Sequence, residues 1–261
     1  MTERGILMIL FESLLVAFST YSALPMPQFE WNRRNMQYAI CFFPMVGLVC
    51  GLVLLGWHQL CRWQQVSEIF FAAGAVILPL LLTGGIHMDG YMDTVDALSS
   101  HQPKERKLEI LKDSHCGAFA ILYCGIYLVA QLGLWAELYR MDVAGSLWPL
   151  FILSRAFSAF FAVFLPNARG SGMLCTYTEN THRRKAIAAI LFFVILGAAA
   201  LACLAPLSGS AAGVGGLLGA IACVFLAMKE FEGVTGDICG FLLQICEISC
   251  LAGAWIGGVL A

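Results

Sequence analysis

Long apolar runs separated by short polar segments fill almost the whole chain. Seven of these runs approach the roughly 20 residues that an α-helix needs to cross a bilayer. They are Ala39–Leu60, Val66–Thr83, Gly117–Leu138, Leu147–Pro166, Ala186–Ala205, Ala211–Met228 and Ile238–Leu260. The pattern predicts an all-α fold, a polytopic transmembrane helical bundle of about seven spans.

An eighth apolar segment, Gly5–Leu24, differs from the others. It carries Glu12 near its middle, has a polar end, and is followed by Pro25 and Pro27. A charge at the middle of a span is costly in lipid, so we expect an interfacial or re-entrant helix here. A full span is the alternative.

Composition agrees with a protein in contact with the lipid bilayer. The chain is 60% hydrophobic and 12% charged, against about 25% charged residues in an average soluble domain. No long soluble insertion is visible, so residues 1–261 are expected to form a single integral membrane catalytic domain. The net charge of −2 and the lack of a basic tract predict no nucleic acid partner. The 11 cysteines lack a Cys-x-x-Cys motif and are interpreted as small buried hydrophobes.

The basic residues predict the orientation of the bundle. With the loop before the first strong span in the cytoplasm, the opposite side holds only Arg62 and Arg140. The cytoplasmic segments hold Arg4, Arg33, Arg34, Lys104, Arg106, Lys107, Lys112, Arg169, Arg183, Arg184, Lys185 and Lys229. This positive-inside bias predicts a multi-pass protein whose polar loops, and therefore its active site, face the cytoplasm.

A polar island at residues 84–97 follows the second strong span. Asp89, Asp93 and Asp96 stand at i, i+4 and i+7, which places them on one face of a helix. Three like charges at that spacing repel unless a cation shares them. Carboxylates suit Mg²⁺, or Mn²⁺, bound together with substrate phosphates. The alternative is a solvated helix end.

The same island holds further candidates. His87 is a candidate base or phosphate contact, and Gly85 and Gly90 are assigned to substrate binding. A histidine without a ligand role is the alternative for His87.

A charged segment, Lys104–Lys112, precedes the third strong span. Pro103 and the alternating charges predict a short amphipathic cytoplasmic helix, or else a mere connector. Directly after it, Lys112 could hold a phosphate, Asp113 could complete a metal site, and Ser114 could contact substrate or cap the next helix.

Two charged residues lie inside spans, and two more lie in Gly-rich loops. Arg155 should pair with an anion, either a substrate phosphate or a carboxylate such as Glu247, because a lone charge in lipid is costly. Glu247 is itself a candidate substrate-binding residue on the same ground. Arg169 begins a Gly-rich loop that could wrap a phosphate, although turns have the same composition. Gly236 allows close backbone approach to a ligand, and Asp237 is a metal ligand or a helix N-cap.

Taken together, these motifs resemble the cobalamin synthase family of adenosylcobinamide-GDP ribazoletransferases. The matching segments are Gly-Gly-Ile-His-Met-Asp-Gly-x-x-Asp-Thr-x-Asp at 84–96, Leu108–Gly117, Ser154-Arg155, the Ala-Arg-x-x-Gly loop at 168–172 and Gly-x-Thr-Gly-Asp-x-x-Gly at 233–240. Three positions depart from the family pattern, namely Ala23, Ala97 and Gln244. None of them removes an expected metal ligand.

The resemblance implies a Mg²⁺-dependent reaction that joins adenosylcobinamide-GDP to α-ribazole or its 5′-phosphate and releases GMP. It implies that Asp89, Asp93 and Asp96, with Asp113 or Asp237, bind the metal. The phosphates would be held by Arg155, Arg169 and Lys112. It further implies a bacterial or archaeal cell membrane, and allows for a homo-oligomer or a complex with an enzyme of the same pathway.

Other classes fit less well. A CDP-alcohol phosphotransferase would carry Ala-Arg after its first Asp-Gly, whereas Tyr91 and Met92 follow Asp89-Gly90 here. An intramembrane prenyltransferase would need two separated aspartate-rich motifs. A transporter would show polar residues in several spans and an internal repeat, and we find no repeat.

Overall fold

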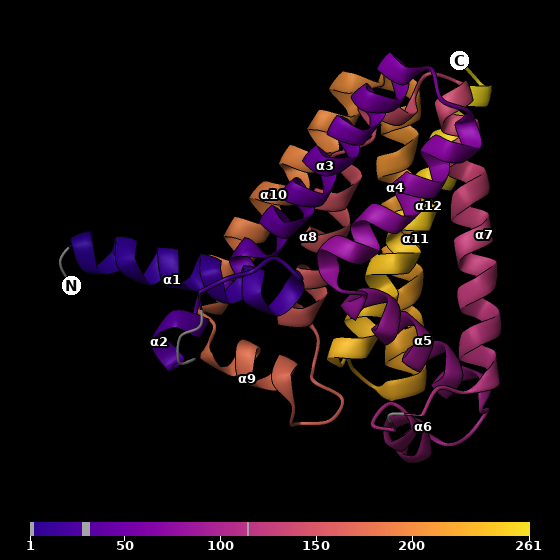
Figure 1. The fold of residues 1–261 in the computed structure, drawn as a ribbon. Coiled ribbons are helices and arrows are strands. Elements are labelled where there is room, and N and C mark those ends of the chain that lie inside the picture. Colours follow the sequence, from indigo (N-terminus) through magenta and orange to yellow (C-terminus); the bar gives the residue numbers. More distant parts are fainter. Residues whose placement is uncertain (1–2, 28–31, 114) are drawn as a thin grey trace.

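The computed structural model describes residues 3–27, 32–113 and 115–261, and these ranges are almost wholly helical. The elements are α1 (Glu3–Tyr21), α2 (Arg33–Met36), η1 (Ala39–Phe42), α3 (Phe43–Gln64), α4 (Glu68–Thr83), α5 (Ile86–Ser99), α6 (Lys104–Ile110), α7 (Ala118–Arg140), η2 (Ala144–Ser146), α8 (Leu150–Phe164), α9 (Met173–Asn180), α10 (Arg183–Leu204), α11 (Pro206–Phe231) and α12 (Gly236–Val259). Figure 1 shows the long helices running side by side as a bundle, which confirms the all-α prediction.

The seven expected apolar runs all form helices, but two of them are short. By length and composition, five helices can cross a membrane alone: α3 with the turns before it, α7, α10, α11 and α12. The other two, α4 and α8, have 16 and 15 residues. Counting α4 with α5 as one bent span raises the number to six, so the expected count of about seven includes helices shorter than a straight span.

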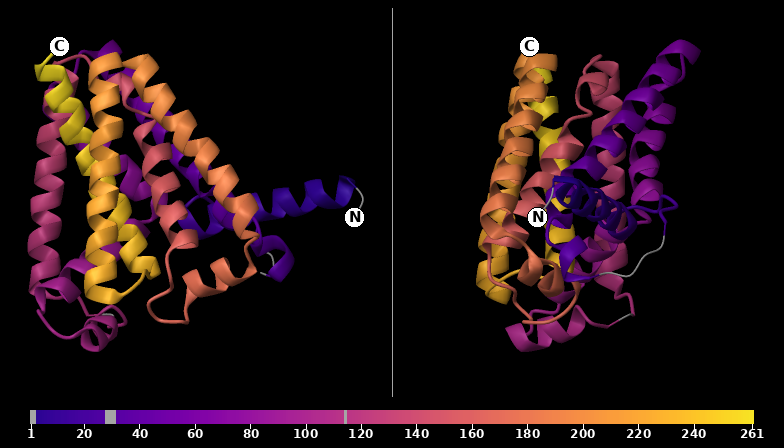
Figure 2. Two further views of the ribbon diagram at one scale, coloured as in Figure 1. Left: turned by 180° about the vertical axis from the view of Figure 1, so that it is seen from behind. Right: turned by 90° about the vertical axis from the view of Figure 1, so that its left-hand side faces the viewer.

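The N-terminal helix α1 runs across the long axes of the bundle, and its first half projects from the side (Figures 1 and 2). Leu7 and Phe11 on this half are 66% and 60% exposed. Exposed apolar side chains on a crosswise helix agree with the expected interfacial helix. The other end of α1 enters the bundle, where Val16 and Ala17 are fully buried.

A sharp bend of 95° separates α4 from α5. Two consecutive glycines form it, because Gly84 and Gly85 have φ values of 62° and 77°, in the left-handed region that side chains disfavour. The Gly85 N–H donates to the carbonyl of Leu80 at 2.9 Å and closes the end of α4. The bend brings α5 against α12 and α7.

The short helix α6, predicted from its charge pattern, packs against the end of α11. Lys107 Nζ lies 2.5 Å from Glu230 Oε2, and Lys104 Nζ lies 2.5 Å from Glu232 Oε2. The Lys107 side chain is only 8% exposed, so its charge depends on this partner. These ion pairs fix the segment that leads into α7.

We expect Glu230→Gln to weaken the docking of α6 by about 2 kcal/mol, because the substitution leaves the buried Lys107 ammonium without its counter-charge. Hydrogen exchange of the α6 amides in nanodiscs measures the effect as faster exchange. The matched control is Glu109→Gln, which breaks an ion pair with Arg106 whose two side chains are 61% and 64% exposed. Equal exchange in the two variants would contradict this account.

Candidate active site

The carboxylates predicted to act together gather where α5 crosses the start of α12. Glycines bring the two backbones into contact, since a Cβ on Gly90 would stand 2.8 Å from the carbonyl oxygen of Asp237. A Cβ on Gly240 would stand 3.1 Å from the carbonyl oxygen of His87. This close crossing places Asp237, in the first turn of α12, beside the aspartates of α5.

The electrostatics of this crossing are those of crowded carboxylates. Burial, and then the charges of Asp89 and Asp237, raise the pKa of Asp93 to about 6. Arg169 acts in the opposite direction, and Asp96 adds a smaller repulsion. One guanidinium therefore acts against four neighbouring carboxylates, which leaves an excess of negative charge at this crossing.

Arg169 reaches the carboxylates because two distant loops pair. The Ala168 N–H donates to the carbonyl of Val234, and the Val234 N–H donates to that of Pro166, both at 2.9 Å. The guanidinium Nη2 then lies 3.2 Å from Asp237 Oδ2. The ion pair with Asp237 occupies Nη2, whereas the buried Nε has no hydrogen-bond partner among the described atoms, so this side chain keeps a donor for an anionic ligand.

The loop between α6 and α7 meets the site at Gly117. A Cβ on Gly117 would fall 2.1 Å from a carboxylate oxygen of Asp96, so this glycine lets the loop lie against Asp96. Asp113 instead bonds His115 of its own loop, and the hydrogen bond from the His115 N–H lowers the pKa of Asp113. Lys112 is exposed in the turn after α6. Ser114 lies outside the described residues.

His87 is almost wholly buried, and it lines the same pocket as Asp89 and Asp237. It is 5% exposed, with its ring 6.2 Å from that of Tyr21 and 5.3 Å from that of Phe43. Burial, and then the charge of Arg155, hold the pKa of His87 well below its usual range. Its Nε2 is buried without a hydrogen-bond partner among the described atoms, so it is free to bond a ligand.

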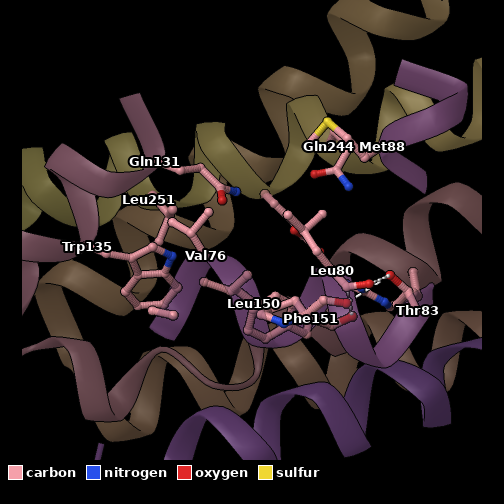
Figure 3. Close-up of a pocket in the computed structure, with 14 residues that line it drawn as sticks. Val76, Leu80, Thr83, Met88, Gln131, Trp135, Leu150, Phe151, Gln244 and Leu251 are labelled. Atoms are coloured by element: carbon pink, nitrogen blue, oxygen red, sulfur yellow. Dashed lines mark hydrogen bonds and ion pairs between the residues drawn. The ribbon is translucent and has the colours of Figure 1, made fainter. Parts of the chain in front are cut away.

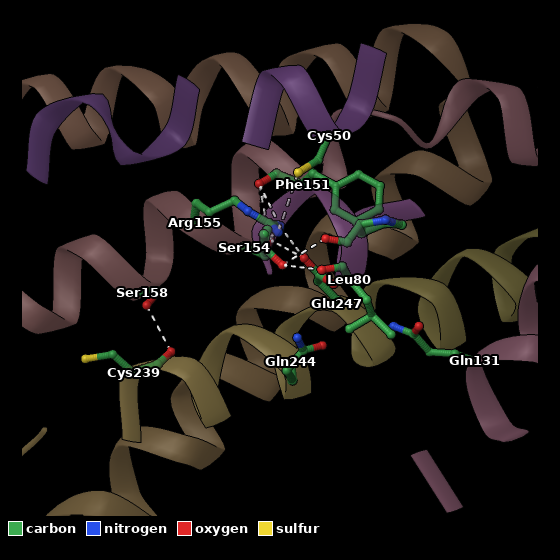
Figure 4. A network of polar contacts seen from close by, with 12 residues as sticks. Cys50, Leu80, Gln131, Phe151, Ser154, Arg155, Ser158, Cys239, Gln244 and Glu247 are labelled. Carbon is green, nitrogen blue, oxygen red and sulfur yellow. Dashed lines mark hydrogen bonds and ion pairs between the residues drawn. The ribbon is translucent and has the colours of Figure 1, made fainter. Parts of the chain in front are cut away.

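Arg155 and Glu247 form a buried ion pair in the bundle interior (Figure 4). Arg155 is 1% exposed, and Ser154 Oγ donates to Glu247 Oε1 at 3.1 Å. This is the carboxylate pairing weighed above as the alternative to a phosphate ligand. The charge of Arg155 is therefore neutralised by Glu247 and not by the aspartates of α5.

A small cavity next to this pair is lined by polar and apolar side chains, including Gln131, Gln244 and Thr83 (Figure 3). Its volume is about 10 Å³, at the lower limit for a single water molecule. Gln131 Nε2 donates to Tyr127 Oη at 2.7 Å, and that hydroxyl donates to Gln244 Oε1 at 2.5 Å. The polar side chains of this network therefore bond one another, and the cavity beside them is too small for a substrate.

A larger pocket of about 220 Å³ adjoins the carboxylates. Asp89, Asp237 and Gly236 line it together with residues of α1, η1, α3, α8 and α9. Gly85 lines a neighbouring open groove that also contains Asp89. Gly90, expected to contact substrate, is buried against the backbone of α12. The pocket and the groove are therefore the spaces next to the aspartates.

The donor chemistry of the site fits a hard divalent cation, since Asp89, Asp93, Asp96 and Asp237 offer only carboxylate oxygens. Within the described part of the chain, no three His, Cys, Asp or Glu side chains lie close enough together to form a metal cage. The carboxylates are therefore not placed closely enough to enclose a metal ion on their own.

Comparison with known proteins decides the family. The family model described as cobalamin-5-phosphate synthase matches residues 13–255 of this chain. The chain belongs to that family. The match confirms the resemblance drawn from the motifs. The matched residues, 13–255, include every candidate residue of the site.

Curated relatives carry a consistent name. A Lachnoclostridium phytofermentans protein called adenosylcobinamide-GDP ribazoletransferase is 38% identical over 240 residues, or 90% of each chain. Proteins of the same name from Clostridium botulinum strain Alaska E43 and Geobacillus thermodenitrificans are 32% and 30% identical, over 92% and 88% of this chain and 95% and 90% of theirs. No solved structure matches the chain.

The fold adds residues to the site that the motifs did not single out as ligands. Tyr21 and Phe43 pack on His87, and Gly117 and Gly240 permit close approach of Asp96 and of α5. The polar end of the first apolar segment was a signal for Tyr21. Nothing in the local sequence shows that it meets His87.

Gly90→Ala tests the helix crossing. We expect a loss of about 1–3 kcal/mol of stability from overpacking, because the new Cβ would meet the backbone of Asp237. We also expect turnover to fall about 100-fold as the carboxylates separate. Thermal unfolding and GMP release in nanodiscs measure the two effects. Gly125→Ala in α7, where a Cβ meets no atom within 4 Å, is the control and should leave both near wild type.

Proposed function

We propose that this chain joins adenosylcobinamide-GDP to α-ribazole, or to α-ribazole 5′-phosphate, and releases GMP. The product is adenosylcobalamin or its 5′-phosphate, which makes the enzyme a phosphotransferase acting on substituted phosphate groups. The names of the relatives support the substrates. The single observation that carries the proposal is the convergence of the α5 aspartates with Asp237 and Arg169 at one helix crossing.

The proposed chemistry is a displacement at phosphorus. A hydroxyl oxygen of ribazole bonds to the phosphorus next to cobinamide, the bond to the bridging oxygen breaks, and GMP leaves with that oxygen. The proton of the attacking hydroxyl passes to His87 or to a site carboxylate. Such a reaction depends mainly on positioning and on neutralising charge.

We propose that Asp89, Asp93, Asp96 and Asp237 hold Mg²⁺, or Mn²⁺ in its place. A divalent cation would relieve the repulsion that raises the pKa of Asp93. When bound, it supplies charge neutralisation at the pyrophosphate and at the departing GMP. Asp113 would join these residues only by turning away from His115.

Arg169 is the proposed phosphate ligand, because its buried Nε keeps a hydrogen-bond donor while Nη2 pairs with Asp237. Lys112 is exposed near the loop that meets Asp96, so it is available to a phosphate entering from solution. Arg155 and Glu247 are assigned to the stability of the bundle, on the ground of their buried ion pair.

We further propose that the site faces the cytoplasm of a bacterial or archaeal cell. In Figure 1, α5, α6, α9 and the start of α12 lie toward the same end of the bundle. The basic loops assigned to the cytoplasm by the positive-inside rule include those that carry Lys112 and Arg169.

A turnover assay in nanodiscs tests the function. The protein is mixed with adenosylcobinamide-GDP, α-ribazole or its phosphate, and Mg²⁺, and mass spectrometry follows GMP and the corrinoid product. We expect equal amounts of GMP and product, both abolished by EDTA. Release of CMP from a CDP-alcohol, without GMP release from adenosylcobinamide-GDP, would replace this proposal with the CDP-alcohol phosphotransferase alternative.

A further inference from the structure

The pocket beside the carboxylates has walls suited to a flat apolar ring. Its volume is about 220 Å³, whereas a dry engineered cavity of roughly 150 Å³ accepts benzene. The apolar walls come from five separate elements and consist of Tyr21, Ile40, Phe43, Ala159, Ala162 and Leu174. The rings of Tyr21 and Phe43 pack against each other, with centroids 4.3 Å apart, so one side of the pocket is aromatic.

Hydrogen-bonding capacity inside the pocket is small and specific. Ser158 Oγ lines it but already donates to the carbonyl of Cys239 at 3.0 Å. His87 also lines it, and its Nε2 is buried without a hydrogen-bond partner among the described atoms. A buried polar atom of this kind is costly unless a ligand satisfies it. The pocket is therefore suited to an apolar ring that carries one polar atom able to form a hydrogen bond with His87 Nε2.

One edge of the pocket is polar and leads to the reaction site. Asp89 and Asp237 line the same space as the aromatic rings. A ligand with its ring among the apolar walls would therefore hold any sugar attached to that ring next to the carboxylates.

We propose that this pocket binds the benzimidazole base of ribazole and directs its ribose hydroxyl toward Asp89 and Asp237. The inference rests on the proposed function and extends it to the place of the acceptor. Benzimidazole is a planar bicycle with one free ring nitrogen, to which His87 donates in the tautomer protonated at Nε2; the proton of the attacking hydroxyl then passes to a site carboxylate. The ring's remaining edge is apolar, as are the walls.

The donor substrate fits this pocket less well. Guanine presents a carbonyl, ring nitrogens and an amino group, and each would lose hydrogen bonds to water on entering apolar walls. A corrin ring is too large for about 220 Å³. The donor is therefore placed on the other side of the carboxylates, toward the open groove lined by Gly85.

Ala162→Leu tests the assignment by filling the pocket. We expect the KM for α-ribazole to rise about 10-fold or more, with the KM for adenosylcobinamide-GDP within twofold of wild type. The matched control is Ala188→Leu, the same substitution at an exposed position of α10, which should change neither KM. A rise in the KM for adenosylcobinamide-GDP alone would place the guanine in the pocket and overturn the proposal. Unchanged values for both substrates would also overturn it.

Equilibrium binding separates this inference from the function itself. α-Ribazole is titrated into nanodisc-embedded protein without the donor substrate. We expect Ala162→Leu to weaken binding about 10-fold, and His87→Phe to weaken it about 3- to 10-fold. An analogue with carbon in place of the free ring nitrogen should bind wild type and His87→Phe equally. Absence of GMP release by wild type would refute the function, while equal ribazole affinity in wild type and Ala162→Leu would refute the pocket.

Discussion

Asp89→Asn should lower turnover by about 1,000-fold while leaving the protein folded. Asp89 lies at the contact between the pocket, the open groove and the other carboxylates, so its charge acts where the substrate phosphates must lie. The amide keeps the size of the side chain and removes the charge that binding of a cation requires. The rate of GMP release in nanodiscs measures the effect.

The control for this substitution is Asp142→Asn. Asp142 is exposed, pairs with Arg62 at 3.4 Å, and precedes α8 on the side of the bundle assigned to the opposite face of the membrane. Its loss should change turnover less than twofold, since exposed ion pairs contribute little. Near-normal activity of Asp89→Asn, with a thermal unfolding profile like wild type, would remove Asp89 from the reaction.

Arg155→Met should destabilise the bundle by about 3–5 kcal/mol, the largest stability effect that we expect. The substitution leaves the Glu247 carboxylate buried without a counter-charge, and breaking a buried pair on one side is strongly unfavourable. Thermal unfolding in nanodiscs should show a much lower midpoint. The loss should be larger than that of Glu230→Gln, whose carboxylate is partly exposed.

The double variant Arg155→Met/Glu247→Leu distinguishes a structural role from phosphate binding. Replacing both charges with apolar groups removes the unpaired carboxylate, so stability should return toward wild type. If the pair is structural, the KM for adenosylcobinamide-GDP returns with it. Recovered stability together with a KM that stays raised at least 10-fold would show that Arg155 contacts the substrate.

The sequence predicted the helices and the aspartate face well, because both depend on short-range spacing. Apolar runs mark helices regardless of their partners, and the i, i+4, i+7 spacing places Asp89, Asp93 and Asp96 on one face of any helix. The sequence places the polar island at 84–97 directly after the second apolar run, without a prediction of the bend between them. The size and direction of the bend depend on φ values that no residue pattern specifies.

The remaining features of the site depend on contacts between distant segments. The sequence suggested either a substrate phosphate or a carboxylate such as Glu247 for Arg155, and packing shows that Glu247, 92 residues away, is its partner. The same holds for Tyr21 of α1 against His87 of α5, and for Gly117 against Asp96. Each of these pairs is brought together by the crossing of whole helices or by a loop closing on one.

The central claim is that α5 and α12 contribute to one cation site, and binding of Mn²⁺ tests it most directly. Electron paramagnetic resonance of nanodisc-embedded protein counts free and bound Mn²⁺ during a titration, for wild type, Asp89→Asn, Asp237→Asn and Asp142→Asn. We predict saturable binding by wild type and Asp142→Asn, and a loss of affinity of at least 10-fold in both Asp89→Asn and Asp237→Asn. Wild-type affinity in Asp237→Asn would contradict a site shared between the two helices.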